Sequence, residues 1–206
     1  PEAVRKVFIA CFGLSFVLGI YLVYLWGWPI VIIGLLALLL GVIYTGGPFP
    51  LAYYGLAELP AFLFFGPIAC ATTTFVQIGS WSTAALIAGV SAGFFSVALL
   101  SINNLRDYQE DRKVGKRTLI ARFGRRFGVI EYGFSILSAT LIPLSFLYFA
   151  PTHSMIGITA ISSLMALHAL RITINYREPS ELYAVLKMTS KLQIIFTVIF
   201  SVTWVI

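Results

Sequence analysis

The sequence predicts an all-α protein that crosses a lipid bilayer several times as a single domain over residues 1–206. Hydrophobic residues make up 59% of the chain, and charged residues only 11%. The 8 acidic and 14 basic residues are too few to cover a soluble domain of this length. The apolar residues also gather in runs long enough to span a membrane. This composition excludes a soluble enzyme, a nucleic-acid-binding domain and a disordered segment.

Each apolar run is expected to form a helix, because backbone polar groups in hydrocarbon must bond within their own segment. A helical span needs roughly 20 apolar residues. The second run is short and rich in glycine, and Pro29 suits the first turn of its helix. The sequence predicts seven spans, at about 4–26, 29–45, 58–78, 83–103, 127–150, 155–175 and 188–206.

The connections between these spans alternate in charge. No Lys or Arg occurs in the short connections near 27–28, 79–82 and 151–154. All 14 basic residues lie in or beside the N-terminus and the segments 46–57, 104–126 and 176–187. Because basic residues mark the cytoplasmic side of membrane proteins, this side is predicted to be cytoplasmic and the C-terminus to lie outside.

A polar stripe follows the fourth span. Asn103, Asp107 and Asp111 recur at every fourth residue, so they share one face of a helix. Two carboxylates one turn apart repel each other unless a cation lies between them, and Mg²⁺ typically takes one or two carboxylates together with phosphate oxygens. The basic residues around the pair that could hold phosphate are Arg106, Arg112, Lys116 and Arg117. An ordinary basic loop with surface ion pairs, worth ~0–1 kcal/mol each, is the alternative.

The other polar residues of the spans give weaker signals. Glu58 either orients the glycine-rich loop before it or favours a helix N-terminus, and a structural role is the preferred interpretation. His168 either binds substrate or packs through a hydrogen bond. Cys11 and Cys70 lie in apolar stretches, so neither a disulfide nor a zinc site is expected.

Two blocks of the sequence resemble a known family. They read NNLRDYQEDRKVGKRTL from Asn103 to Leu119 and YTGGPFPLAYYGLAELPAFLFFGP from Tyr44 to Pro67. Both are similar to the UbiA-type intramembrane prenyltransferases, above all to those that act on 1,4-dihydroxy-2-naphthoate. The resemblance implies a bundle of nine spans that joins a polyprenyl diphosphate to an aromatic acceptor with Mg²⁺. It also implies that the product is demethylmenaquinone, with loss of CO₂ and diphosphate.

The resemblance assigns roles to residues at the cytoplasmic face. Asp107 and Asp111 would be the catalytic residues and hold Mg²⁺ on the diphosphate, with Asn103 as a neighbouring polar ligand to the metal or as a positioning group. The expected diphosphate-binding residues are Arg106, Arg112, Lys116 and Arg117, and the expected substrate-pocket residues are Tyr44, Tyr53 and Asn104. The enzyme would lie in a bacterial inner membrane with its active site facing the cytoplasm.

The sequence departs from the family at one motif. An earlier N-x-x-x-D-x-x-x-D motif is expected, yet Asp107 and Asp111 are the only aspartates in the chain. We therefore expect the domain to be N-terminally incomplete and two helices that carry the first motif to precede Pro1. The alternatives are another aromatic acceptor (4-hydroxybenzoate, homogentisate or a chlorophyll precursor), a membrane transporter, and a non-catalytic assembly fragment.

Overall fold

The computed structural model of the protein describes residues 2–206, and within that range the chain is helical without strands. Seven helical segments are long and apolar enough to cross a membrane, as predicted. The α-helices are α1 (Glu2–Trp26), α2 (Trp28–Thr45), α3 (Leu51–Tyr54), α4 (Glu58–Phe64), α5 (Pro67–Ile78), α6 (Thr83–Lys113), α7 (Leu119–Phe123), α8 (Arg125–Leu141), α9 (Phe146–Phe149), α10 (Ser163–Asn175) and α11 (Leu182–Val205). Short 3₁₀ segments are η1 (Ile142–Ser145), η2 (Pro151–Ser162) and η3 (Pro179–Glu181).

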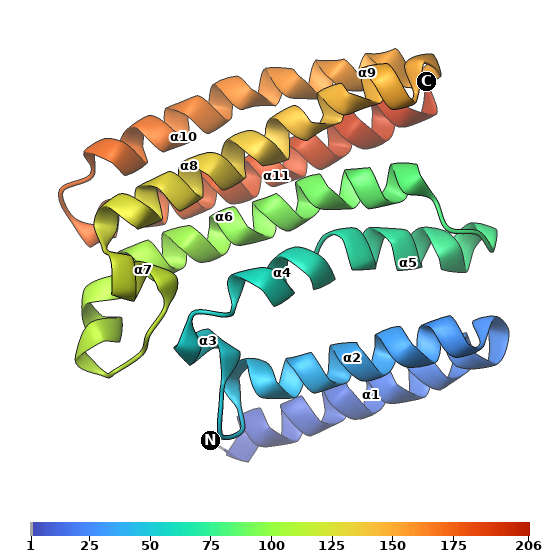
Figure 1. The fold of residues 1–206 in the computed structure, drawn as a ribbon, viewed down its shortest axis with the longest axis horizontal. Coiled ribbons are helices and arrows are strands. Elements are labelled where there is room, and N and C mark those ends of the chain that lie inside the picture. Colours follow the sequence, from blue (N-terminus) through green and yellow to red (C-terminus); the bar gives the residue numbers. More distant parts are fainter. Residues whose placement is uncertain (1) are drawn as a thin grey trace.

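The main core lies in a bundle of four helical columns, formed by α6, α8, η2 with α10, and α11 (Figure 1). Its centre is apolar and fully enclosed, with side chains such as Phe95, Ile102, Ile136 and Leu192 almost without exposure. Tyr132 is also buried there, and its hydroxyl bonds to Thr189 Oγ1 at 2.9 Å. This bundle holds α6 on two sides, and α6 carries the polar stripe.

Helices α4 and α5 pack on the outer side of α6 through glycine. Gly66, between α4 and α5, lies so close to α6 that a Cβ atom there would come within 2.6 Å of both the Gly89 carbonyl oxygen and the Gly93 Cα. Pro67 follows directly and cannot continue the hydrogen bonding of α4, because proline has no backbone N–H. The predicted third span is therefore two helices rather than one.

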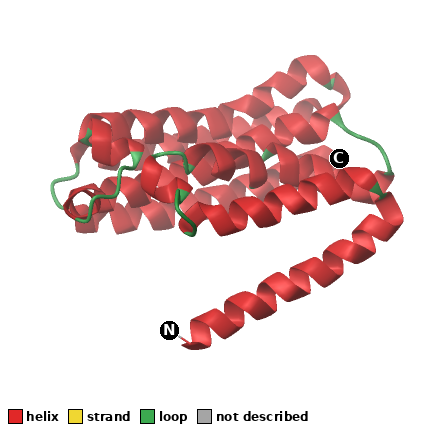
Figure 2. Ribbon diagram, turned by 60° about the horizontal axis from the view of Figure 1, so that its bottom comes forward, coloured by secondary structure: helices red, strands yellow, loops and turns green. Residues whose placement is uncertain are grey.

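Helices α1 and α2 form a hairpin in which α1 diverges from the bundle, whereas residues of α2 line a cavity together with α4 and α5. In Figure 2, α1 points away from the remaining helices. None of its residues is buried, and α2 buries only Ile30. Near the outer end of the hairpin, the Trp26 ring lies 5.2 Å from that of Phe75 in α5. The hairpin therefore exposes apolar surface along most of its length.

Several span boundaries differ from the prediction. The last span begins at Leu182 instead of 188, because η3 leads into α11 through a capping box of Glu178 and Glu181. Lys187 therefore lies inside the last helix. The fourth span continues as one helix to Lys113, where basic residues favour a helix C-terminus. The fifth and sixth spans contain 3₁₀ segments that start beside prolines.

The connections that carry or adjoin basic residues lie at one end of the molecule, and the connections without Lys or Arg lie at the other end, as the charge pattern predicted. In Figure 1, α3, α7 and the turn between α10 and α11 lie at one end. The turns after α1, α5 and α9 lie at the other end. All chemistry that needs charge is thereby confined to the end that carries α3 and α7.

Arg125 stabilises this charged end. Its Nη2 donates to the Tyr176 carbonyl at 2.6 Å and the Ile174 carbonyl at 3.3 Å, and its guanidinium lies 4.0 Å from the centre of the Tyr176 ring. Burial raises the pKa of Tyr176, and the Arg125 charge opposes that rise. Arg125→Ala should lower the free energy of unfolding by about 1–2 kcal/mol, through lost carbonyl bonds and a lost cation–π contact. Thermal unfolding in detergent checks this value. Arg126→Ala, at an exposed neighbour, should leave the midpoint unchanged.

Candidate functional site

The polar stripe occupies the last three turns of α6. Asn103 and Asp107 are partly exposed, whereas Asp111 is buried with 8% of its surface accessible. The three residues follow one another at i, i+4 and i+8 on an unbroken helix, so they form one line of oxygen donors. The structure therefore brings together the proposed catalytic and metal-binding residues on one face.

Each aspartate already has a cationic partner. Arg106 binds Asp107 with two bonds, Nε to Oδ1 at 2.7 Å and Nη2 to Oδ2 at 2.6 Å. Lys116 Nζ lies 3.1 and 3.2 Å from the two oxygens of Asp111. Tyr183 of α11 covers Arg106, whose guanidinium carbon is 4.6 Å from the ring centre. Arg106 and Lys116 thus lie where they could transfer from a carboxylate to a bound phosphate.

The other two predicted phosphate-binding residues lie differently. Arg112 donates from Nε to the Ala121 carbonyl and lies over the Tyr108 ring, so it ties α6 to α7. Arg117 has an exposed side chain. With Pro50, Tyr53, Tyr54 and Gly115 it lines an open polar cavity of about 290 Å³. The structure therefore gives Arg112 a structural contact and leaves Arg117 facing a cavity.

The segment before α4 is joined to the loop after α6. The backbone N–H of Arg117 donates to the Tyr53 carbonyl at 2.7 Å, and Arg122 Nη2 donates to the Tyr54 carbonyl at 2.8 Å. Gly55 makes this approach feasible. It has a φ of 72°, and a Cβ atom there would lie 2.9 Å from the Arg117 carbonyl oxygen. The two sequence blocks that carry the family resemblance are therefore in direct contact.

Two acidic residues in membrane-spanning segments border the stripe, and the sequence interpretation gave neither a catalytic role. Asn104 Nδ2 donates to Glu58 Oε1 at 3.3 Å, and Ser101 Oγ donates to Glu131 Oε2 at 2.9 Å. The other carboxylate oxygen of Glu58 is buried without a hydrogen-bond partner in the described chain. The signal that could have found both residues is their charge inside apolar segments, because such residues are rare and usually functional.

Some of the remaining candidate residues lie at the site, and others do not. Tyr44 lies near Glu58, and the buried Asn104 donates to Glu58, so both border the site. Tyr53 is exposed at the joined loops. His168 is exposed on α10, away from the stripe. Cys11 and Cys70 are free thiols.

The donor set suits a hard divalent cation that shares its coordination with a ligand. Residues 2–206 contain no group of three His, Cys, Asp or Glu side chains that could enclose a metal by itself. They do provide two carboxylates and one amide oxygen in a line on α6. Mg²⁺ commonly binds one or two carboxylates and completes its coordination with water and phosphate oxygens. Asp107, Asp111 and Asn103 therefore fit Mg²⁺ bound together with a diphosphate.

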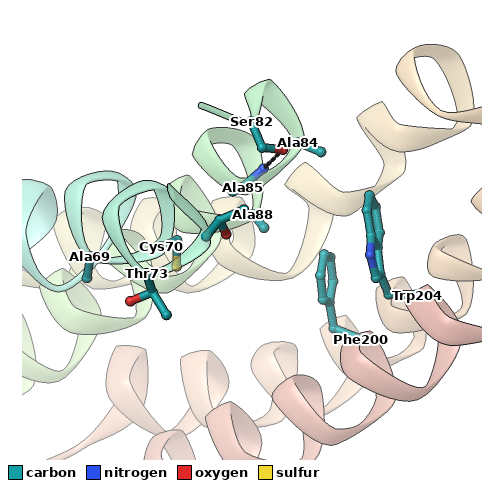
Figure 3. A pocket seen from close by; sticks show the side chains of 10 residues that line it. Ala69, Cys70, Thr73, Ser82, Ala84, Ala85, Ala88, Phe200 and Trp204 are labelled. Atoms are coloured by element: carbon teal, nitrogen blue, oxygen red, sulfur yellow. Dashed lines mark hydrogen bonds between the residues drawn. The ribbon is translucent and has the colours of Figure 1, made fainter. Parts of the chain in front are cut away.

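A separate apolar cavity lies at the opposite end of the molecule. It has a volume of about 420 Å³ and lies between α5, the start of α6 and the end of α11. Figure 3 shows Cys70, Ala88, Phe200 and Trp204 around it. None of the residues that line it is charged.

Comparison with known proteins agrees with these motifs. The sequence model of the UbiA prenyltransferase family matches residues 1–200. A 1,4-dihydroxy-2-naphthoate octaprenyltransferase of Haemophilus influenzae is 30% identical over 170 residues, which are 82% of this chain and 55% of that protein. The enzyme of the same name from Mycobacterium leprae is 28% identical over 198 residues, or 96% of this chain and 66% of that protein.

More distant relatives share part of the chain. The human UbiA prenyltransferase domain-containing protein 1 is 32% identical over 118 residues, 56% of this chain and 33% of that protein. No solved structure shows a significant match. The chain spans about half the length of the first curated relatives that it matches. The match over residues 1–200, together with the stripe on α6 and the joined loops, shows that this chain belongs to the UbiA prenyltransferase family.

Proposed function

We propose that the protein containing this chain transfers a polyprenyl group from a polyprenyl diphosphate to 1,4-dihydroxy-2-naphthoate. The product would be the hydroquinone form of demethylmenaquinone, released with CO₂ and diphosphate, and a separate two-electron oxidation would give the quinone. The observation that carries the proposal is the line of Asn103, Asp107 and Asp111 on α6, with Arg106 and Lys116 already paired to the two carboxylates. The names of the H. influenzae and M. leprae relatives support the choice of acceptor.

The first step would be loss of diphosphate from the allylic carbon. Mg²⁺, when bound at Asp107 and Asp111, would supply positive charge against the diphosphate as the C–O bond breaks. Arg106 and Lys116 would move from the carboxylates onto phosphate oxygens, because charge-assisted bonds to a diphosphate replace those that they leave. Both side chains would reach the phosphates from positions next to the two carboxylates. Stabilising the leaving charge lowers the barrier directly.

The allylic carbon then needs an electron-rich and water-poor environment. Tyr44, near Glu58, and Tyr53, on the segment joined to the loop after α6, would supply aromatic faces, which stabilise a cation by about 0.5–2 kcal/mol. The acceptor ring attacks, so that a carbon–carbon bond forms as the allylic C–O bond breaks. The ring then loses its carboxyl group as CO₂, whose bonding electron pair restores the aromatic ring. No covalent intermediate with the protein is required.

The length of α6 supports a position of the polar stripe at the surface of the membrane. Its 31 residues rise about 46 Å, whereas the hydrocarbon layer is about 30 Å thick. The stripe therefore lies in the headgroup layer when α6 begins at the opposite interface. The diphosphate can bind there while its polyprenyl tail stays in lipid, where each buried CH₂ contributes about 0.8 kcal/mol. We place this face in the cytoplasm of a bacterial cell, with the chain in the inner membrane.

An acceptor panel tests the function. The complete protein, in lipid with Mg²⁺ and a polyprenyl diphosphate, should prenylate 1,4-dihydroxy-2-naphthoate and release CO₂. Transfer should be lost when EDTA removes divalent cations and return when Mg²⁺ is added. Preference for 4-hydroxybenzoate or homogentisate would contradict the acceptor, and the absence of transfer to every acceptor would contradict the reaction class.

A further inference from the structure

The end of α6 is held from two sides by carboxylates that pair with neither Lys nor Arg in the described chain. Glu58 of α4 accepts a hydrogen bond from Asn104, and Glu131 of α8 accepts one from Ser101. Asn104 and Ser101 are 5% and 0% exposed. Acidic side chains in membrane-spanning segments are costly and need a compensating contact. The compensating contacts here are donors on α6 itself.

The hydrogen bond between Asn104 and Glu58 fixes the rotation of α6 about its own axis near Asp107. An α-helix turns about 100° and rises about 1.5 Å per residue, so Asp107 lies about 60° around the helix and about 4.5 Å along it from Asn104. A rotation that broke the bond between Asn104 and Glu58 would turn Asp107 by the same angle. The direction of Asp107 is therefore set by a contact one turn away.

The same contact also fixes the segment that carries Tyr53. Glu58 is the first residue of α4 and directly follows residues 51–57. The Tyr53 and Tyr54 carbonyls of that segment accept bonds from Arg117 and Arg122, beyond the end of α6. With Glu58 bound to Asn104, the segment has three attachments, one each to α6, to the loop after α6 and to α7. It cannot shift without disturbing the residues around Asp111.

We propose that Glu58 and Asn104 are positioning residues, whose hydrogen bond holds Asp107 of α6 and the segment that carries Tyr53 in a fixed relative position. The catalytic consequence rests on the proposed function. The hydrogen bond itself is a structural claim and can be measured separately. The buried, unpartnered oxygen of Glu58 offers a competing role, direct contact with an acceptor hydroxyl, and the test below separates the two.

A donor and acceptor exchange tests the proposal in the complete protein. Asn104→Asp places two carboxylates against each other and should lower kcat about 100-fold, as expected for a misplacement of about 1 Å. KM for the prenyl diphosphate should change much less. Glu58→Gln keeps an oxygen that accepts from Asn104 and should stay close to the unmodified protein. The double variant Asn104→Asp with Glu58→Gln reverses the bond and should regain most of the lost kcat.

Thermal unfolding of the same four proteins supplies a readout that does not depend on transfer. The two substitutions should be coupled, so that the double variant unfolds at a higher temperature than Asn104→Asp alone. Glu110→Gln, which changes an exposed acid paired with Lys113, is the matched control and should change neither readout. If the unmodified protein transfers no prenyl group, the proposed function fails, but the unfolding coupling still decides the contact.

Three results would overturn the inference. Absence of coupling in the unfolding midpoints would mean that the two side chains do not hold each other. A double variant as slow as Asn104→Asp would mean that the bond does not position the site. Loss of kcat in Glu58→Gln alone, with an unchanged midpoint, would mean that the Glu58 carboxylate acts directly on a ligand.

Discussion

Asp107→Asn and Asp111→Asn should each reduce prenyl transfer by the complete protein about 100- to 1,000-fold, the size of effect seen when one transition-state stabilising group is lost. Either substitution removes a negative charge from the line of oxygen donors on α6. At Asp111, the new amide would also place N–H donors within reach of the Lys116 ammonium, 3.1 Å from the present carboxylate. Both changes weaken a divalent cation site and should lower kcat.

The measurement is the steady-state rate at several Mg²⁺ concentrations. The concentration of Mg²⁺ for half-maximal rate should rise in both variants. Glu110→Gln, also on α6 but exposed and paired with Lys113, should retain the full rate. Because Asp111 is buried, the unfolding midpoint of the Asp111→Asn variant must be recorded as well, so that a folding defect is recognised. Undiminished transfer in both aspartate variants would rule out this site.

The second large effect concerns stability. Gly66→Ala should lower the free energy of unfolding by about 3 kcal/mol, the upper range for inserting an atom into a close-packed interface. The new Cβ would meet the Phe62 and Gly89 carbonyl oxygens and the Gly93 Cα, and the Gly89 and Gly93 atoms would lie 2.6 Å away. All three are backbone atoms, so no side chain can rotate to make room. Helices α4 and α5 would have to move away from α6.

Thermal unfolding in detergent checks this prediction, with a glycine that has open space around it as the control. A Cβ atom added to Gly34, in the middle of α2, would meet no atom of another residue within 4 Å. Gly34→Ala should therefore stabilise the chain by about 0.5–1 kcal/mol, the usual gain of alanine over glycine within a helix. An equal midpoint for the two alanine variants would mean that the close approach at Gly66 does not limit packing.

The sequence was sufficient for the features that depend on composition and period. Hydropathy located all seven spans, and charge placed their connections at the correct ends. The spacing of Asn103, Asp107 and Asp111 predicted a line of donors, because one unbroken helix determines that geometry. The assigned chemistry of this line stays a prediction until it is measured.

Contacts between distant segments could not be predicted in the same way. Pro67 explains why the third span divides, but the close approach of Gly66 to Gly89 could not be predicted, because hydropathy contains no information about that distance. Arg112 has the same charge as Arg106, yet it binds a backbone carbonyl of α7. The bond between Glu58 and Asn104 joins residues 46 positions apart. Such pairings depend on the packing of helices, which a local pattern does not contain.

If the proposed transfer takes place at the stripe, the 31-residue length of α6 makes bilayer thickness one of its variables. With the start of α6 held at one interface, a thicker bilayer would draw Asp107 towards the hydrocarbon and a thinner one would lift it into water. A site near the end of one straight helix changes its depth relative to the lipid headgroups when the bilayer thickness changes. The cell that contains this protein would therefore set the hydration of the diphosphate, and with it the rate, through the acyl-chain length of its own lipids.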